Sequence, residues 1–174
     1  MPKGYRKADA SEMESLTKIR NEHHEELRDH DVQVGLLFAR AGRDQHGEAT
    51  SHPIKFAGVP VVARVRRTSV KERIWCPYDA VIEVDEDRWE GMSEDERVAV
   101  IDHELTHVVV AKDKAGAAII GDDLRPQIAM RPDDWMLTGF AEVVKRHGRA
   151  AIEAQAIHEI SEKFGQLIFD FAGA

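Results

Sequence analysis

One stretch of the chain reads Ser93-Glu94-Asp95-Glu96-Arg97-Val98-Ala99-Val100-Ile101-Asp102-His103-Glu104-Leu105-Thr106-His107-Val108-Val109-Val110. Ser93 followed three residues later by Glu96 is the capping-box pattern of a helix N-terminus, and Asp95 adds negative charge to the first turn. Behind this start, apolar residues recur at helical spacing in one stripe, at Val98, Ile101, Leu105 and Val108 or Val109. The pattern predicts a helix over residues 94–110 that packs across the core and carries both histidines along one flank.

The two histidines, His103 and His107, are four residues apart and therefore lie on one face of the predicted helix. Both imidazoles can reach one metal ion, and Zn2+ suits imidazole nitrogen. Glu104 lies about 100° around the helix from His103, so its carboxylate lies beside the ion and can take a proton from an attacking water. Bound zinc also polarises a scissile carbonyl. This spacing indicates a zinc centre with Glu104 as general base, in preference to two surface histidines.

A catalytic zinc site needs a third protein ligand, because the motif supplies only two. The downstream candidates are Asp122, Asp123, Asp133, Asp134, Glu142 and His147. If a helix starts at Pro132, Asp133 lies on its inward face, whereas Glu142 points nearly the opposite way. Asp133 is therefore the first choice, although a carboxylate there would equally stabilise a helix N-terminus. His147 lies at the edge of the same face and could instead stabilise an oxyanion or close the helix end.

The remaining elements follow from hydrophobic periodicity. Helical spacing predicts further helices over residues 11–27, 132–147 and 150–169. Runs of β-branched and aromatic residues predict strands over residues 32–39, 59–65 and 74–84, and short segments at 115–121 and 127–130 predict a hairpin. We therefore expect an α+β fold, in which a small mixed or antiparallel sheet packs against the central helix and further helices.

Length and composition are typical of one globular domain. The 174 residues can bury a sizeable core without disulfides. We expect a single domain over residues 1–174, with a core at about 10–148 and a C-terminal helix at 150–169 that packs on the core rather than on another copy. The single cysteine, Cys76, lies in an apolar run and is expected to be a buried small hydrophobe. It suits a cytoplasmic location, and no apolar run is long enough to span a membrane.

The net charge of −8 argues against broad attraction to nucleic acid or to an anionic membrane. One local exception is a basic stretch made of Arg64, Arg66, Arg67, Lys71 and Arg73. It could contact phosphate, but a solvated strand edge is the preferred interpretation. A second cluster, made of His23, His24 and His30, is interpreted as solvated histidines, because adjacent helical residues point about 100° apart.

Four stretches around the motif carry a family resemblance: Tyr78-Asp79-Ala80-Val81-Ile82-Glu83-Val84, Trp89 through Arg97, Asp102-His103-Glu104-Leu105-Thr106-His107, and Val143-Val144-Lys145-Arg146-His147-Gly148. They resemble the putative phage metallopeptidases, which are small zincin-like proteins of phages and bacterial genomes. The resemblance covers about residues 22–148. The strand before the motif and the Arg-His-Gly helix ending identify the family better than the HExxH motif, which many zincins share. The resemblance implies a zincin-like fold, a zinc ion and hydrolysis of peptide bonds.

In one place the chain departs from that family. A His-Asp pair after Arg-Pro often precedes the last matching helix of the family, whereas this chain has Arg131-Pro132-Asp133-Asp134. An aspartate in the place of the histidine would preserve a ligand of a different type. The chain is more distantly similar to SprT-like proteases, which act on proteins crosslinked to DNA, and the basic stretch is the one feature that favours this likeness.

Three functions remain as hypotheses. The leading one is a zinc-dependent protease acting on a protein or peptide, with His103, His107 and Asp133 as ligands and Glu104 as general base. The second is a binding or regulatory protein that keeps zinc for structure, which a filled tetrahedral shell would indicate. The third is a metal-dependent hydrolase of a substrate other than protein. The sequence carries no signal for oligomeric state or cleavage preference.

Overall fold

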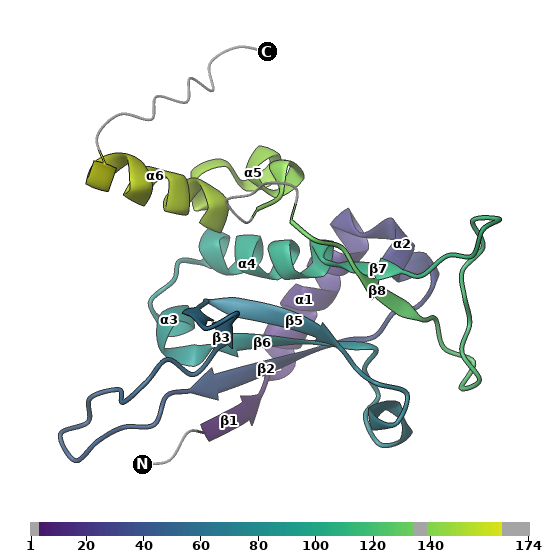
Figure 1. Ribbon diagram of the computed structural model, residues 1–174, viewed down its shortest axis with the longest axis horizontal. Coiled ribbons are helices and arrows are strands. Elements are labelled where there is room, and N and C mark those ends of the chain that lie inside the picture. The colour runs from purple at the N-terminus through teal and green to yellow at the C-terminus, as the bar shows by residue number, and fades with distance from the viewer. Residues whose placement is uncertain (1–3, 134–138, 165–174) are drawn as a thin grey trace, which may run out of the picture.

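The computed structural model describes residues 4–133 and 139–164 of the chain. Its largest sheet has four strands in the order β1 (Gly4–Lys7), β2 (Val34–Arg40), β6 (Ala80–Asp85) and β5 (Ala63–Arg67). Strands β2 and β6 run parallel, and the two outer pairs are antiparallel. The long helices lie over one face of this sheet (Figure 1). The predicted α+β fold with a small mixed sheet is therefore confirmed.

The two faces of the sheet differ in chemistry, because side chains alternate along each strand. On the face that the helices cover, Leu36 of β2 lies beside Ile82 of β6, and both side chains are buried in the main core. On the other face, Arg64 of β5 lies beside Glu83 of β6 and donates to its carboxylate at 2.7 Å. The central helix therefore packs against the apolar face of the sheet.

The first helix ends earlier than predicted. Helix α1 (Ala10–His23) starts from a capping box between Asp9 and Glu12, and a separate short helix α2 (Glu25–Asp29) follows. His24 breaks the helix, with a φ of −126° and a ψ of 67°. Its Nε2 atom lies 2.7 Å from the Asp102 carboxylate, so the interpretation of this histidine as solvated is wrong, whereas His23 and His30 are exposed.

The central helix, α4 (Glu94–Thr106), begins at the predicted capping box of Ser93 and Glu96. It ends four residues before the predicted end, because Val108–Val110 forms strand β7 instead of another helical turn. Three consecutive β-branched residues favour an extended backbone, and here they gain a pairing partner. Helix α4 lies between the sheet and the C-terminal helices (Figure 1), and its residues from Ala99 to Thr106 are buried on every side.

The segments on either side of the central helix differ in detail from the prediction. The partner of β7 is β8 (Ile128–Met130). The predicted hairpin between residues 115–121 and 127–130 is therefore present only in part: Ile120 and Pro126 form an isolated bridge, and backbone hydrogen bonds join Gln127 to Ile119 and Gly121 to Arg125. Before the helix, the predicted strand at 59–65 divides into β4 (Val59–Pro60) and β5, and β4 pairs with β3 (Lys55–Phe56). The predicted strand at 74–84 begins only at Ala80, after a short 3-10 helix, η1 (Glu72–Ile74), and helix α3 (Glu86–Glu90) follows it.

In the C-terminal region, the helix predicted at 132–147 starts later than expected, whereas a helix is present within the range predicted at 150–169. Residues 131–133 are not helical, and α5 (Ala141–His147) begins nine residues after Pro132, although it ends at the predicted place. A 3-10 turn, η2 (Gly148–Ala150), leads into α6 (Ile152–Phe164), which packs on α4. Residues 134–138 and the predicted helical residues 165–169 lie outside the described residues. Cys76 is half-buried rather than buried. In the described part of the chain, no helix is both long and apolar enough to cross a membrane.

Candidate metal centre

Two imidazoles lie at the C-terminal end of α4. His103 belongs to the last turn of the helix, and His107 is its C-cap residue, so the motif ends the helix instead of lying in its middle as predicted. The Nδ1 atom of His103 lies 2.7 Å from Oε1 of Glu153, and Nδ1 of His107 lies 2.8 Å from the carbonyl oxygen of Arg131. Both acceptors require the ring hydrogen of each neutral histidine to be on Nδ1. Each Nε2 atom then has a free lone pair, which is the state that binds a metal ion.

The third candidate ligand, Asp133, approaches both of these nitrogens. Its Oδ1 atom lies 3.8 Å from Nε2 of His103 and 3.7 Å from Nε2 of His107. The three ligand atoms lie within 4.8 Å of one another, which makes them the one such group among the described residues. The prediction thus selected a residue that reaches the histidines, but for a wrong reason, since Asp133 lies on no described helix. It lies three residues after the end of strand β8.

A divalent ion fits this group by two criteria. The Oδ1 atom of Asp133 is buried without a hydrogen-bond partner in the described structure, which is costly unless a cation or a proton compensates it. In a tetrahedral zinc site with bonds of about 2.0 Å, neighbouring ligand atoms lie about 3.3 Å apart. The two distances from Asp133 Oδ1 to the imidazoles exceed this value by about half an ångström, and all three ligand atoms lie within 4.8 Å of one another. Two neutral imidazoles and one carboxylate are a donor set that zinc accepts.

Glu104 lies beside this group in a buried setting. Its side chain is 4% exposed, and the backbone N–H of Val65 in strand β5 donates to it. Burial raises the pKa of Glu104 to about 7, and the neighbouring charge of His103 only partly opposes this effect. A carboxylate with a pKa near neutrality can both accept and return a proton, which is the property required of a general base that later acts as an acid.

A buried aromatic ring covers the two histidines. The Phe140 side chain is fully buried, and its ring centroid lies 5.0 Å from that of His103 and 4.7 Å from that of His107. The Arg131 guanidinium lies 5.0 Å from the centroid of the same ring. This apolar wall keeps water away from one side of the imidazoles and limits their rotation.

Glu153 contacts the centre and was missed by the sequence analysis. It is 3% exposed, and its Oε1 atom accepts from Nδ1 of His103 and from the backbone N–H of Phe140 at 3.2 Å. Burial alone would raise the pKa of Glu153, but the hydrogen bonds from His103 and from backbone N–H groups, together with the attraction of His103, outweigh it and lower the pKa. The residue lies fifty positions after the motif, in a helix that the sequence analysis interpreted only as packing.

A buried carboxylate lies next to the first ligand in the chain. Asp102 is fully buried and accepts from His24, from Arg146 and from His147, at distances of 2.7 to 2.9 Å. Burial would raise the pKa of Asp102, but these hydrogen bonds outweigh it and hold the pKa well below its usual range. We call these four residues the Asp102 hub. It joins the α1–α2 junction and helix α5 to helix α4.

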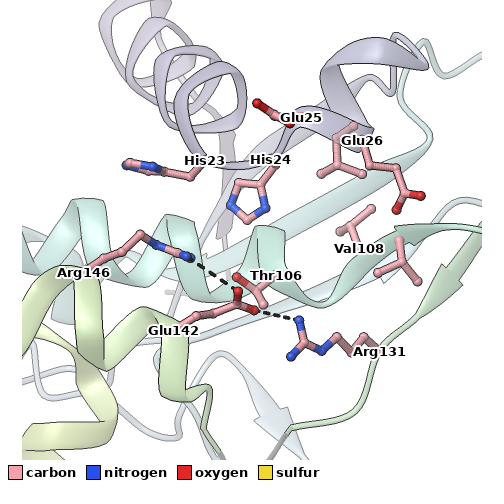
Figure 2. Close-up of a pocket in the computed structure, with 11 residues that line it drawn as sticks. His23, His24, Glu25, Glu26, Thr106, Val108, Arg131, Glu142 and Arg146 are labelled. Atoms are coloured by element: carbon pink, nitrogen blue, oxygen red, sulfur yellow. Dashed lines mark hydrogen bonds and ion pairs between the residues drawn. The ribbon is translucent and has the colours of Figure 1, made fainter. Parts of the chain in front are cut away.

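A hollow of about 200 Å3 opens beside the Asp102 hub, between α1–α2, the end of α4, strand β7 and helix α5 (Figure 2). Figure 2 shows Glu142 between two arginines, at 2.7 Å from Arg131 and 3.8 Å from Arg146. Since Arg131 also holds His107 through its carbonyl, this row of charges connects the hub to the second histidine. The three candidate ligands do not line the hollow, and we therefore do not regard it as the reaction site.

The other predicted ligand candidates lie elsewhere. His147 belongs to the Asp102 hub and Glu142 to the row of arginines, while Asp123 lies 3.1 Å from Arg73. Asp122 is exposed and lies outside the candidate ligand group, and Asp134 lies outside the described residues.

Most of the basic stretch faces carboxylates of its own chain. Arg64 and Arg66 pair with Glu83, and Arg73 pairs with Asp79 and Asp123. Charges that are already paired attract a phosphate backbone less strongly. The structure thus gives the basic stretch a role in holding strand β5 and its loop, in line with the preferred interpretation of a strand edge.

A mixed α+β fold with two histidines, an aspartate and a glutamate around one point is an arrangement typical of metal-dependent hydrolases. The family described as "Putative phage metallopeptidase" matches residues 6–164. The chain therefore belongs to this family, as its motif and helix ending had suggested, and the match extends beyond the resembling region into helix α6. The family's name implies a metal ion and peptidase activity. No curated protein and no solved structure matches the chain.

Proposed function

We propose that this protein is a zinc-dependent peptidase in which His103, His107 and Asp133 hold the ion and Glu104 is the general base. The observation that carries the proposal is the convergence of two Nε2 atoms on a buried, unpartnered Asp133 oxygen, with the Glu104 carboxylate beside them. When bound, zinc would supply a Lewis acid that acidifies water and polarises the scissile carbonyl.

The protein's own groups then move the proton. Glu104 accepts a proton from the water that attacks the carbonyl carbon, and it returns that proton to the leaving nitrogen as the C–N bond breaks. The Val65 N–H fixes the Glu104 carboxylate during both transfers. The Phe140 ring excludes water from one side of the centre, which strengthens the electrostatic interactions there.

The position of strand β5 supports a peptide as the substrate. It is an edge strand of the sheet, and its residue Val65 contacts Glu104. An extended peptide can add to the edge of a sheet through main-chain hydrogen bonds. A peptide lying along β5 would therefore pass close to the general base.

The alternative of a structural zinc site has less support. A structural zinc has four protein ligands, whereas the group found among the described residues offers three, with Glu104 next to it. A likeness to proteases acting on DNA-bound proteins rested on the basic stretch, and three of its arginines are paired with carboxylates. We therefore favour a protein or peptide as substrate without a nucleic-acid requirement.

The test is hydrolysis of a peptide library by zinc-loaded wild type, Glu104→Gln and Glu94→Gln. Glu94 lies exposed in the first turn of the same helix and serves as the matched control. We expect Glu104→Gln to lower kcat by about 10²- to 10⁴-fold while it keeps its zinc, and Glu94→Gln to behave as wild type. Cleavage that persists in Glu104→Gln, or in wild type after chelation of the metal, would contradict the proposal.

A further inference from the structure

We propose that Glu153 is a positioning residue that holds His103 in the metal-binding tautomer, and that helix α6 is therefore a working part of the metal centre. The inference deepens the proposed function and rests on its zinc site. It concerns a helix that the sequence analysis had interpreted only as core packing.

The hydrogen bond between Glu153 and His103 fixes the tautomer of the imidazole. An ionised carboxylate only accepts hydrogen bonds, so Oε1 of Glu153 at 2.7 Å requires the hydrogen of His103 to be on Nδ1. The Nε2 lone pair then points to the side where Asp133 lies. His107 obtains the same tautomer from the backbone carbonyl of Arg131, but only His103 receives it from a charged group. A charged acceptor makes the imidazole a more basic ligand.

The backbone just before α5 packs closely against the Glu153 side chain. A Cβ atom on Gly139 would lie 2.3 Å from Cγ of Glu153, so any other residue at position 139 would displace the carboxylate. The next residue, Phe140, donates its N–H to the same oxygen that His103 uses. The backbone of Gly139 and Phe140, just before α5, thus fits closely around Glu153.

A glutamate at position 153 does not serve the stability of the fold alone. Its second carboxylate oxygen, Oε2, is buried and has no partner within the described structure. Buried polar atoms are normally paired, and an exception calls for an explanation. The contact with a metal ligand supplies one, because a carboxylate orients a ligating histidine better than an apolar residue of the same size can.

Helix α6 also offers a matched control. Gln155 donates to Glu96 at 2.8 Å and so joins α6 to α4 without contacting the centre. Loss of this contact loosens the same two helices as loss of Glu153. The comparison of the two positions therefore separates orientation of His103 from docking of the helix.

The experiment measures zinc affinity by chelator competition on metal-free wild type, Glu153→Ala, Glu153→Gln and Gln155→Ala. We expect Glu153→Ala to weaken zinc binding by about 10- to 100-fold. Glu153→Gln should lie between it and wild type, because its amide oxygen still accepts from Nδ1 but carries no charge. Gln155→Ala should stay within about twofold of wild type, since it leaves the ligands untouched. The visible spectrum of the cobalt-loaded proteins should shift in the Glu153 variants only.

Zinc binding by the Glu153 variants as tight as in wild type, or an equal loss in Gln155→Ala, would overturn the inference. If Glu153→Ala does not fold, Glu153→Gln decides, because it preserves the size of the side chain. A wild type that binds no zinc would overturn this inference and the proposed function together. A wild type whose zinc affinity depends on Glu153 as expected, but which hydrolyses no peptide, would overturn the proposed function alone.

Discussion

Phe140 contacts both candidate histidine ligands with its aromatic ring. Its replacement by alanine would leave a cavity beside them, so we expect Phe140→Ala to lower the free energy of unfolding by about 3–5 kcal/mol. Urea unfolding of the metal-free protein measures this cost. The control is Phe56→Ala, since Phe56 is 67% exposed and its loss should cost less than about 0.5 kcal/mol. Equal effects of the two changes would contradict the described packing.

At the same scale, helical spacing was enough to predict that His103, Glu104 and His107 lie close together. Spacing works there because the three residues share one helix, whose geometry is fixed. Glu153 reaches His103 through packing of two helices fifty residues apart, and no local pattern encodes that contact. Asp133 was the first choice as third ligand because a helix was predicted to start at Pro132. The structure has no helix at residues 131–133, so the reasoning that selected Asp133 was wrong.

Helix α4 is held to its neighbouring helices by the Asp102 hub. Removal of one member of a buried ion pair leaves the others uncompensated, so Asp102→Ala should lower the free energy of unfolding by about 3–5 kcal/mol. The control, Asp95→Ala, removes an exposed carboxylate from the first turn of the same helix and should cost less than about 1 kcal/mol. Chemical denaturation of the metal-free variants gives both values. A similar small cost at the two positions would show that the hub does not hold the helices together.

Element boundaries were less predictable than element types. The start of α4 was correct, because a capping box is a local hydrogen-bond pattern that the structure reproduces. Its end was wrong, because Val108–Val110 pairs with a strand twenty residues further on. Pro132 was interpreted as a helix start, where proline is common, but residues 131–133 are not helical. The non-helical segment that results continues from β8 toward the histidines.

For the molecule as a whole, stability should fall in acid. The pKa of Asp102 is lowered by the hydrogen bonds that outweigh its burial, and the pKa of Glu12 is lowered chiefly by its hydrogen bond with Arg6. A carboxyl whose pKa is lower in the folded state adds stability above its unfolded pKa of about 4, and this stability is lost as the pH falls through the folded value. Glu104 is protonated in both states below that pH and does not change the slope.

Thermal unfolding of the metal-free protein between pH 5 and pH 2.5 checks this expectation. The unfolding midpoint of wild type should fall steadily below about pH 4, and the slope should be shallower in Asp102→Asn, which has no carboxylate to protonate at that position. A midpoint that stays level or rises in acid would contradict the assigned hydrogen bonds.

The layered arrangement of the chain could be predicted only in outline. Composition and periodicity indicated helices against a small mixed sheet, because the spacing of apolar residues within each segment shows which face of that segment is buried. The parallel pairing of β2 with β6 and the position of β5 at the edge depend on contacts between distant segments, which local patterns do not specify. These long-range contacts bring Val65 to Glu104 and Glu153 to His103, and they complete the site.

The most direct test of the metal centre is the zinc content of protein purified without added metal, for wild type, His103→Ala, Asp133→Ala and Asp122→Ala. Asp122 is an exposed aspartate outside the candidate group and serves as the control. We predict close to one zinc ion per chain in wild type and Asp122→Ala, and little in the other two variants. A wild type that holds no zinc even after loading, or an Asp133→Ala protein that keeps it fully, would contradict the three-ligand centre.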